Sequence, residues 1–344
     1  MLLCLKKMAA NKKSALALAL LLLISYASCK QPAREPENSI AYLSDPPWLQ
    51  SSNTQAVSSV LESLSNENGF GYSLLKAGNE SEMAALAKSA VEKNGLVFAT
   101  SFATDKALID AAFDDMDTII ACFGANSEES NVCNLSIRTE EAAFFAGIIA
   151  AVESKTGAVA YLGAYQNTSN DPMMAGFTAG AKTVRPDIQV FHQYVFSYNS
   201  PSLASTYISE LINSSVDIIF ADCGASIIGI EGTARSEKIR IICSDSFRYE
   251  SEKTIAFLEI DLKPMVRDLV RMYLDKNLVR GASYTYGLDN KVFNYDLAAA
   301  SQETKDEVDK YKVILFEFAT DLPRNQDELD KFDFEYFRSV QFGI

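Results

Sequence analysis

Short apolar runs alternate with longer segments of helical period from Ser39 onward. The longer segments carry Ala, Leu, Val or Met on one face and Ser, Glu or Lys on the other, as amphipathic helices do. The pattern predicts strands at 40–43, 72–75, 96–99 and 118–122, with helices between them at 54–66, 81–93 and 103–114. Strands and helices that alternate in this way predict a parallel sheet with helices on both faces.

The same alternation restarts further along the chain. After a strand near 131–138 and a helix near 140–155, it predicts strands at 158–162, 188–191, 217–221 and 239–243, with helices at 172–183, 201–213 and 226–236. Two successive units of this kind predict an α/β protein with two doubly wound lobes. We expect residues 39–142 and 254–284 in lobe 1, and residues 143–253 and 285–344 in lobe 2. Ligands of such sheets bind beyond the carboxyl ends of the strands, which here means between the lobes.

The composition of the chain disfavours several classes of function. The chain has 344 residues and a net charge of −14, so an acidic surface disfavours binding to nucleic acid. Its single histidine, His192, lies within an apolar segment at 188–196 that we expect to continue the strand begun at 188, which favours a half-buried structural role over membership of a catalytic triad or a zinc site. The sequence carries no GxSxG, P-loop, GxGxxG or HExxH motif. We therefore expect no catalytic residues, no metal, no cofactor and no enzymatic activity.

The first residues resemble an export signal. Lys12 and Lys13 precede an apolar stretch at 15–24, which is followed by Ala27-Ser28-Cys29. Ten apolar residues are too few to cross a membrane, which takes about 20. The pattern predicts a lipoprotein signal peptide at 1–28, with Met1 or Met8 as its start, lipidation of Cys29 and a polar tether at 29–38. The protein would then be anchored to the cell membrane, facing the periplasm or the exterior. Plain secretion with an incidental Cys29 is the alternative.

The remaining cysteines of the exported part are Cys122, Cys133, Cys223 and Cys243. Their spacing matches no metal-binding motif, and each lies in or beside an apolar run. We expect buried free thiols, because a free cysteine behaves as a small apolar residue. An exported protein also permits a disulfide, for which Cys122 and Cys133 are the best-placed pair.

Residues that end the expected strands are the candidates for ligand binding. Asp245 follows one apolar strand, and its carboxylate could accept two hydrogen bonds from a sugar diol or simply cap a turn. Lys263 ends another expected apolar strand, where it is either a ligand contact or a solvated lysine. Phe196 could stack on a planar base or belong to the core. The only tryptophan, Trp48, lies in a proline-rich loop just after Asp45 and is a candidate wall of the ligand site.

Three further residues follow expected strands. Ser101 and Phe102 come after the strand at 96–99, and Gly224 comes after the strand at 217–221. All three should lie at the same edge of their sheets.

Five short segments resemble those of one protein family. They are GLVFATSF at 95–102, EAAFFAG at 141–147, AGFTAGAK at 175–182, PDIQV at 186–190 and YGLDNKV at 286–292. Between Ser39 and Pro323 the chain resembles the basic membrane protein family, the substrate-binding lipoproteins of nucleoside ABC importers, and within it the purine nucleoside receptors of spirochaetes. The resemblance implies a type I periplasmic-binding-protein fold whose lobes close on a nucleoside, with an ABC permease and an ATPase as partners.

The resemblance also implies roles for individual residues. Asp245 corresponds to the carboxylate that binds ribose, Lys263 to a lysine that contacts ribose, and Phe196 to a plate that stacks on the base. Asn53 and Asp45 match an asparagine and an aspartate of the family's site.

The chain departs from the family where the base would bind. Ser52 stands in place of a stacking phenylalanine, unless Trp48 substitutes for it, and Cys122 stands in place of an acid. A glycine-rich turn is reduced to the residues 224–229. The sugar side is thus largely kept and the base side is altered. The leading hypothesis is capture of a nucleoside, with a purine nucleoside as the first candidate. The alternative is a diverged sensor or surface antigen of the same fold with another small ligand.

Overall fold

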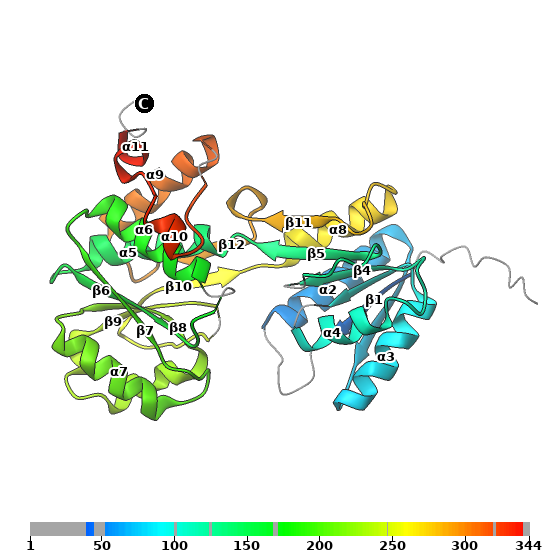
Figure 1. The fold of residues 1–344 in the computed structure, drawn as a ribbon, viewed down its shortest axis with the longest axis horizontal. Helices are drawn as coiled ribbons and strands as arrows, with labels where there is room; N and C mark the ends of the chain where they lie inside the picture. The colour runs from blue at the N-terminus through cyan, green and yellow to red at the C-terminus, as the bar shows by residue number, and fades with distance from the viewer. Residues whose placement is uncertain are drawn as a thin grey trace, which may run out of the picture.

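The computed structural model describes residues 39–44, 52–99, 102–123, 126–167, 171–245, 247–318 and 321–339. These residues form two lobes that lie side by side, each built on a six-stranded sheet (Figure 1).

All neighbouring strands in the sheet of lobe 1 are parallel. The strand order is β11 (Ser283–Tyr286), β5 (Val132–Ile137), β4 (Ile119–Phe123), β3 (Leu96–Ala99), β1 (Ser39–Ser44) and β2 (Gly71–Lys76). Successive side chains of β1 face opposite sides of the sheet. Ile40 and Tyr42 share a core with helices α2 (Ser52–Asn68) and α8 (Lys263–Leu274). Ala41 and Leu43 share another with α3 (Glu80–Lys93) and α4 (Phe102–Ala111).

The sheet of lobe 2 is parallel except at one edge, where β12 runs antiparallel to β10. Its order is β12 (Phe293–Asp296), β10 (Thr254–Ile260), β9 (Arg240–Cys243), β8 (Ile218–Asp222), β6 (Ala158–Gly163) and β7 (Gln189–Tyr194). One face packs against α5 (Thr139–Glu153) and α6 (Asp171–Val184). The other packs against α7 (Pro201–Asn213) and the 3₁₀ helix η1 (Gly224–Gly232).

Helices α5 and α6 pack closely because glycines line their contact. A Cβ at Gly180 would lie 1.9 Å from the carbonyl oxygen of Phe144, so no larger residue fits there. The C-terminal helices also lie over lobe 2: α9 (Gln302–Phe318) contacts α5, and α10 (Gln326–Leu329) and α11 (Phe334–Ser339) contact α6 (Figure 1).

The predicted elements agree with the structure except at two places. The segment 226–236, predicted as an α-helix, forms η1 and a second 3₁₀ helix, η2 (Ser236–Lys238). Tight winding brings η1 against the backbone of α7, where a Cβ at Gly229 would lie 2.0 Å from the carbonyl oxygen of Pro201. Strand β10 belongs to the second sheet through its pairing with β9, whereas the sequence pattern places residues 254–284 in lobe 1. The chain crosses between the lobes after β10, not before it.

Three crossings connect the lobes: from β5 to α5, from β10 to α8, and from β11 to β12 through η3 (Leu288–Asn290) (Figure 1). Arg138 joins the first crossing to the third. Its backbone N–H donates to the carbonyl of Tyr286 at 2.8 Å, and its guanidinium pairs with Glu141 and Asp289. Glu141 also accepts the backbone N–H of Leu288 at 2.7 Å. These contacts tie two crossings together where the lobes meet.

Cys122, Cys133, Cys223 and Cys243 are free and buried, as expected. Burial raises the pKa of the Cys223 thiol, and the nearby charge of Asp222 adds to the shift. These thiols are therefore packing residues rather than nucleophiles. Among the residues that the structure describes, no helix is both long enough and apolar enough to cross a membrane. The expected signal peptide, tether and Cys29 lie outside the described residues.

Candidate functional site

Two carboxylates lie at the carboxyl ends of neighbouring strands in lobe 2. Asp222 is the last residue of β8, and Asp245 lies two residues beyond the end of β9. These strands pair in parallel, and the backbone N–H of Ser244 continues the pairing by donating to Ala221 at 3.0 Å. Asp222, which the sequence marks only as the end of a strand, is therefore a neighbour of the predicted ligand residue Asp245.

Hydroxyl groups from both sides hold the buried carboxylate of Asp222. The phenolic hydroxyl of Tyr161, from β6, donates to its Oδ2 at 3.1 Å. Ser244 Oγ donates to its Oδ1 at 2.7 Å. A carboxylate that is only 9% exposed needs such donors, because an ionised group without partners is costly to bury.

Asp245 is exposed as a residue, but its carboxyl group is surrounded by protein atoms. This burial, together with the negative charge of Asp222, raises the pKa of Asp245 to about 7. Near neutral pH the group thus exists in both protonation states. In either state it can accept hydrogen bonds from a ligand, and when ionised it accepts them more strongly.

Phe196 lies just beyond β7 and points away from the core. Its ring is 61% exposed, and its backbone has a φ of +58°, a conformation that an aromatic residue rarely adopts. Strained backbone of this kind is often found at binding sites. The structure thus places Phe196 at the predicted edge and in solvent.

Two more aromatic residues, which the sequence analysis missed, flank the same edge. Tyr165 follows β6 and Tyr198 follows β7, with exposures of 40% and 49%. Their ring centroids are 5.6 Å apart. Gly224 makes room for this pair: its φ is +56°, and a Cβ there would lie 2.8 Å from the carbonyl oxygen of Tyr198. The signal for both was available, since each stands within four residues of a strand end.

In lobe 1, Lys263 is the first residue of α8 and not the end of a strand. Its backbone N–H donates to Asp261 Oδ1 at 2.9 Å, and its half-exposed side chain places Nζ 3.3 Å from Asp261 Oδ2. Asn53 lies in the first turn of α2, and Phe102 is the first residue of α4. Asp45, Trp48 and Ser101 lie outside the described residues. The structure thus places Phe196, Gly224 and Asp245 at the same edge of one sheet, in lobe 2.

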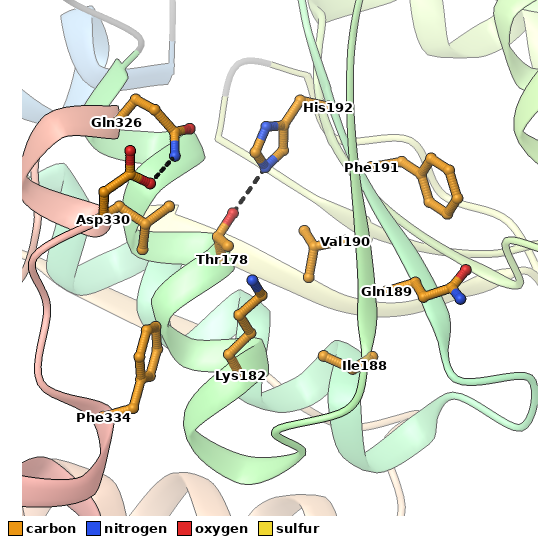
Figure 2. A pocket seen from close by; sticks show the side chains of 11 residues that line it. Thr178, Lys182, Ile188, Gln189, Val190, Phe191, His192, Gln326, Asp330 and Phe334 are labelled. Carbon is orange, nitrogen blue, oxygen red and sulfur yellow. Dashed lines mark hydrogen bonds between the residues drawn. The ribbon is translucent and has the colours of Figure 1, made fainter.

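His192 lies in a different hollow, of about 620 Å³, along the edge strand β7 (Figure 2). Its Nε2 is 2.8 Å from Thr178 Oγ1 on α6, and burial together with the charge of Lys182 lowers its pKa. Gln326 and Asp330 of the C-terminal segment form the facing wall. His192 is more exposed than the sequence pattern predicts, because β7 is an edge strand, and its contact with Thr178 fits a structural role.

Comparisons with known proteins agree with this architecture. Residues 42–318 match the family model described as ABC transporter substrate-binding protein PnrA-like, or Bmp. The chain is 38% identical to basic membrane protein D of Borreliella burgdorferi over 30% of this chain and 31% of that protein. It is 24% identical to the ABC transporter nucleoside-binding protein BmpA of Lactococcus lactis over 76% of this chain and 82% of that protein.

Solved structures share the fold at low sequence identity. One is a transcriptional activator of the comK gene from Bacillus halodurans, with 15% identity, a TM-score of 0.67, and coverage of 83% of this chain and 99% of that one. Another is an ABC transporter solute-binding protein from Aeropyrum pernix, with 14% identity, a TM-score of 0.62, and coverage of 88% and 98%. The two lobes thus have the type I periplasmic-binding-protein fold. With most of its length matched by the family model, the chain belongs to the PnrA-like (Bmp) family of ABC transporter substrate-binding proteins, which bind solutes and are not enzymes.

Proposed function

We propose that this protein captures a nucleoside between its lobes and delivers it to an ABC importer. The observation that carries the proposal is the position of Asp245: an acidic residue with exposed surface at the carboxyl edge of the second sheet, the edge at which the exposed aromatic residues Phe196, Tyr165 and Tyr198 also lie. A ribose offers a pair of hydroxyl donors for the carboxylate, and a base offers a flat face for the rings. The relative BmpA of Lactococcus lactis is described as a nucleoside-binding protein, which supports this ligand class.

The aromatic residues of lobe 2 would contact the base. Phe196 was predicted as one plate, and the pair of Tyr165 and Tyr198 adds a second aromatic surface at the same edge. These two tyrosines are candidates to compensate for Ser52, which stands in place of the family's other stacking ring. An aromatic wall favours a purine, because the larger ring system buries more apolar area.

Lobe closure would complete the site. Asn53 and Lys263 belong to lobe 1, whereas Phe196 and Asp245 belong to lobe 2. A ligand that contacts both lobes stabilises the closed state, since only that state makes both sets of contacts. The crossings near Arg138 are where such a movement would hinge.

Isothermal titration calorimetry with inosine and 2′-deoxyinosine tests the ligand class. We expect inosine to bind more tightly, because deoxyinosine lacks one of the two hydroxyls that Asp245 would accept. Equal affinity for the two would contradict the ribose contact. Absence of binding by any ribonucleoside, with another small molecule bound instead, would favour the diverged sensor or antigen.

We also propose that Cys29 carries the lipid that anchors the protein to the membrane beside its permease and ATPase partners. Stable anchoring takes at least two acyl chains, as a lipoprotein signal would supply. Substitution Cys29→Ser should move the protein from the detergent phase to the aqueous phase in a partition assay. An unchanged partition would contradict lipidation.

A further inference from the structure

The proposed ligand contacts give no role to Asp222, a buried acid of lobe 2. Asp222 is 9% exposed and lies among the carboxyl ends of the three strands β6, β8 and β9. Tyr161 of β6 and Ser244, just after β9, both donate to it. The network therefore links three neighbouring strands at the edge where Asp245 projects.

The network holds the backbone next to Asp245. Ser244 immediately precedes Asp245, and it is fixed twice: its N–H donates to Ala221, and its hydroxyl donates to Asp222. Side chains gain precision when neighbouring groups restrain their backbone. Asp222 thus helps to set the place from which the Asp245 carboxylate meets a ligand.

The network also leaves negative charge beside Asp245. Tyr161 and Ser244 are neutral donors, so their hydrogen bonds stabilise the charge of Asp222 without cancelling it. Two ionised carboxylates at neighbouring strand ends repel each other, and each is harder to ionise while the other is charged.

Among the residues that the structure describes, Tyr295 from β12 is a further titratable group that interacts with Asp245. Its phenolic hydroxyl donates to the carbonyl oxygen of Ala142 at 2.8 Å, so that proton is directed away from Asp245. Burial raises the pKa of Tyr295, and the charges of Asp245 and Asp222 raise it further. Tyr295 therefore adds no compensating charge.

We propose that Asp222 is a positioning residue of the ligand site, and that its charge makes ligand capture by Asp245 depend on pH near neutrality. This inference rests on the proposed function. It is supported by the pKa of Asp245, which burial and the charge of Asp222 raise to about 7. The ionised carboxylate accepts both hydroxyls of a diol as charge-assisted bonds, whereas a proton on Asp245 occupies one acceptor site. Affinity should therefore fall as pH drops below 7, by at most about tenfold per pH unit, and level off at the weaker affinity of the protonated form.

Calorimetry with inosine from pH 5 to pH 8.5 measures this dependence. For Asp222→Asn, which keeps the shape and removes the charge, we expect the midpoint of the pH profile to move about one unit lower. The loss of inosine affinity between pH 8.5 and pH 6 should be several-fold smaller in this variant than in the unmodified protein. An unmoved midpoint would overturn the proposal.

Asp217→Asn is the matched control. Asp217 is also 9% exposed but precedes β8 at the opposite edge of the sheet, where it accepts hydrogen bonds from Ser154, Lys155 and Thr156. This variant should leave the midpoint unchanged. An equal shift in both variants would show a general structural effect and overturn the specific role of Asp222.

A measurement without ligand separates this inference from the proposed function. Carbon NMR of the Asp245 carboxyl, assigned with Asp245→Asn, should show titration near pH 7 in the unmodified protein and at lower pH in Asp222→Asn. Titration near pH 4 in the unmodified protein would overturn the inference. If Asp245 titrates near pH 7 but the protein binds no ribonucleoside, the electrostatic coupling of Asp222 and Asp245 is supported and the proposed nucleoside ligand is contradicted.

Discussion

Glu153 and Asp245 lie at opposite edges of the second sheet, and their pKa values are shifted in opposite directions. At the amino edge, burial disfavours the ionised form of Glu153, but hydrogen bonds from Ser301, Thr304 and Arg240 outweigh it and lower its pKa to about 2. At the carboxyl edge, burial and a neighbouring acid raise the pKa of Asp245 to about 7.

If the proposed function holds, this difference separates a structural charge from a ligand-binding charge. The amino edge supplies Glu153 with hydrogen-bond donors and with the cation of Arg240, so this acid stabilises the fold. At the carboxyl edge, burial and the charge of Asp222 disfavour the ionised form of Asp245. This lowers the stability of the ligand-free fold, and it would leave the carboxylate available for a ligand.

The largest expected effect is on ligand binding at the carboxyl edge. A charge-assisted hydrogen bond contributes about 1.5–3 kcal/mol, so Asp245→Ala should weaken inosine binding by roughly tenfold to over a hundredfold. Glu153→Ala, at the other edge, should leave the affinity of the folded protein unchanged in the same titration. An equal loss of inosine affinity in both variants would contradict a specific role of Asp245 in binding.

The next effect concerns stability at the amino edge. Glu153→Ala removes the acceptor for Arg240, Ser301 and Thr304 and should lower the free energy of unfolding by about 2–3 kcal/mol. Urea denaturation at pH 7 measures the change. The contribution should disappear as the pH falls from about 4.5 towards 2, because the folded-state pKa of Glu153 is depressed. A loss of stability that is the same at pH 7 and pH 2 would contradict this account.

The smallest effect has the opposite sign. The folded-state pKa of Asp245 lies above its ordinary value of 3.8, so ionisation of this group destabilises the ligand-free fold as pH rises from about 4 to about 7. Asp245→Asn should therefore unfold at a higher temperature than the unmodified protein at pH 8, with little difference at pH 4. Calorimetric scans without ligand would show this, and a lower unfolding temperature at pH 8 would be evidence against it.

The site was only partly visible in the sequence. Asp245 could be found because a carboxylate after a buried strand is a local pattern. Tyr165 and Tyr198 follow strands in the same way, but the exposure of their rings depends on how the loops after β6 and β7 fold over Gly224. The position of Lys263 at the start of a helix was misjudged, because an apolar run does not show where a strand ends.

The sequence by itself determined the alternation of strands and helices, the two lobes and the family. Helix α7 matches its predicted bounds, because periodic burial and Pro201 are local signals. Only the tertiary structure decided which strands are neighbours. Asp222 and Tyr161 meet because β6 and β8 are paired while β7, between them in the chain, lies at the edge of the sheet. Hydrogen bonds between strands join residues that are far apart in the chain, so the charge beside Asp245 was fixed by strand order and not by local sequence.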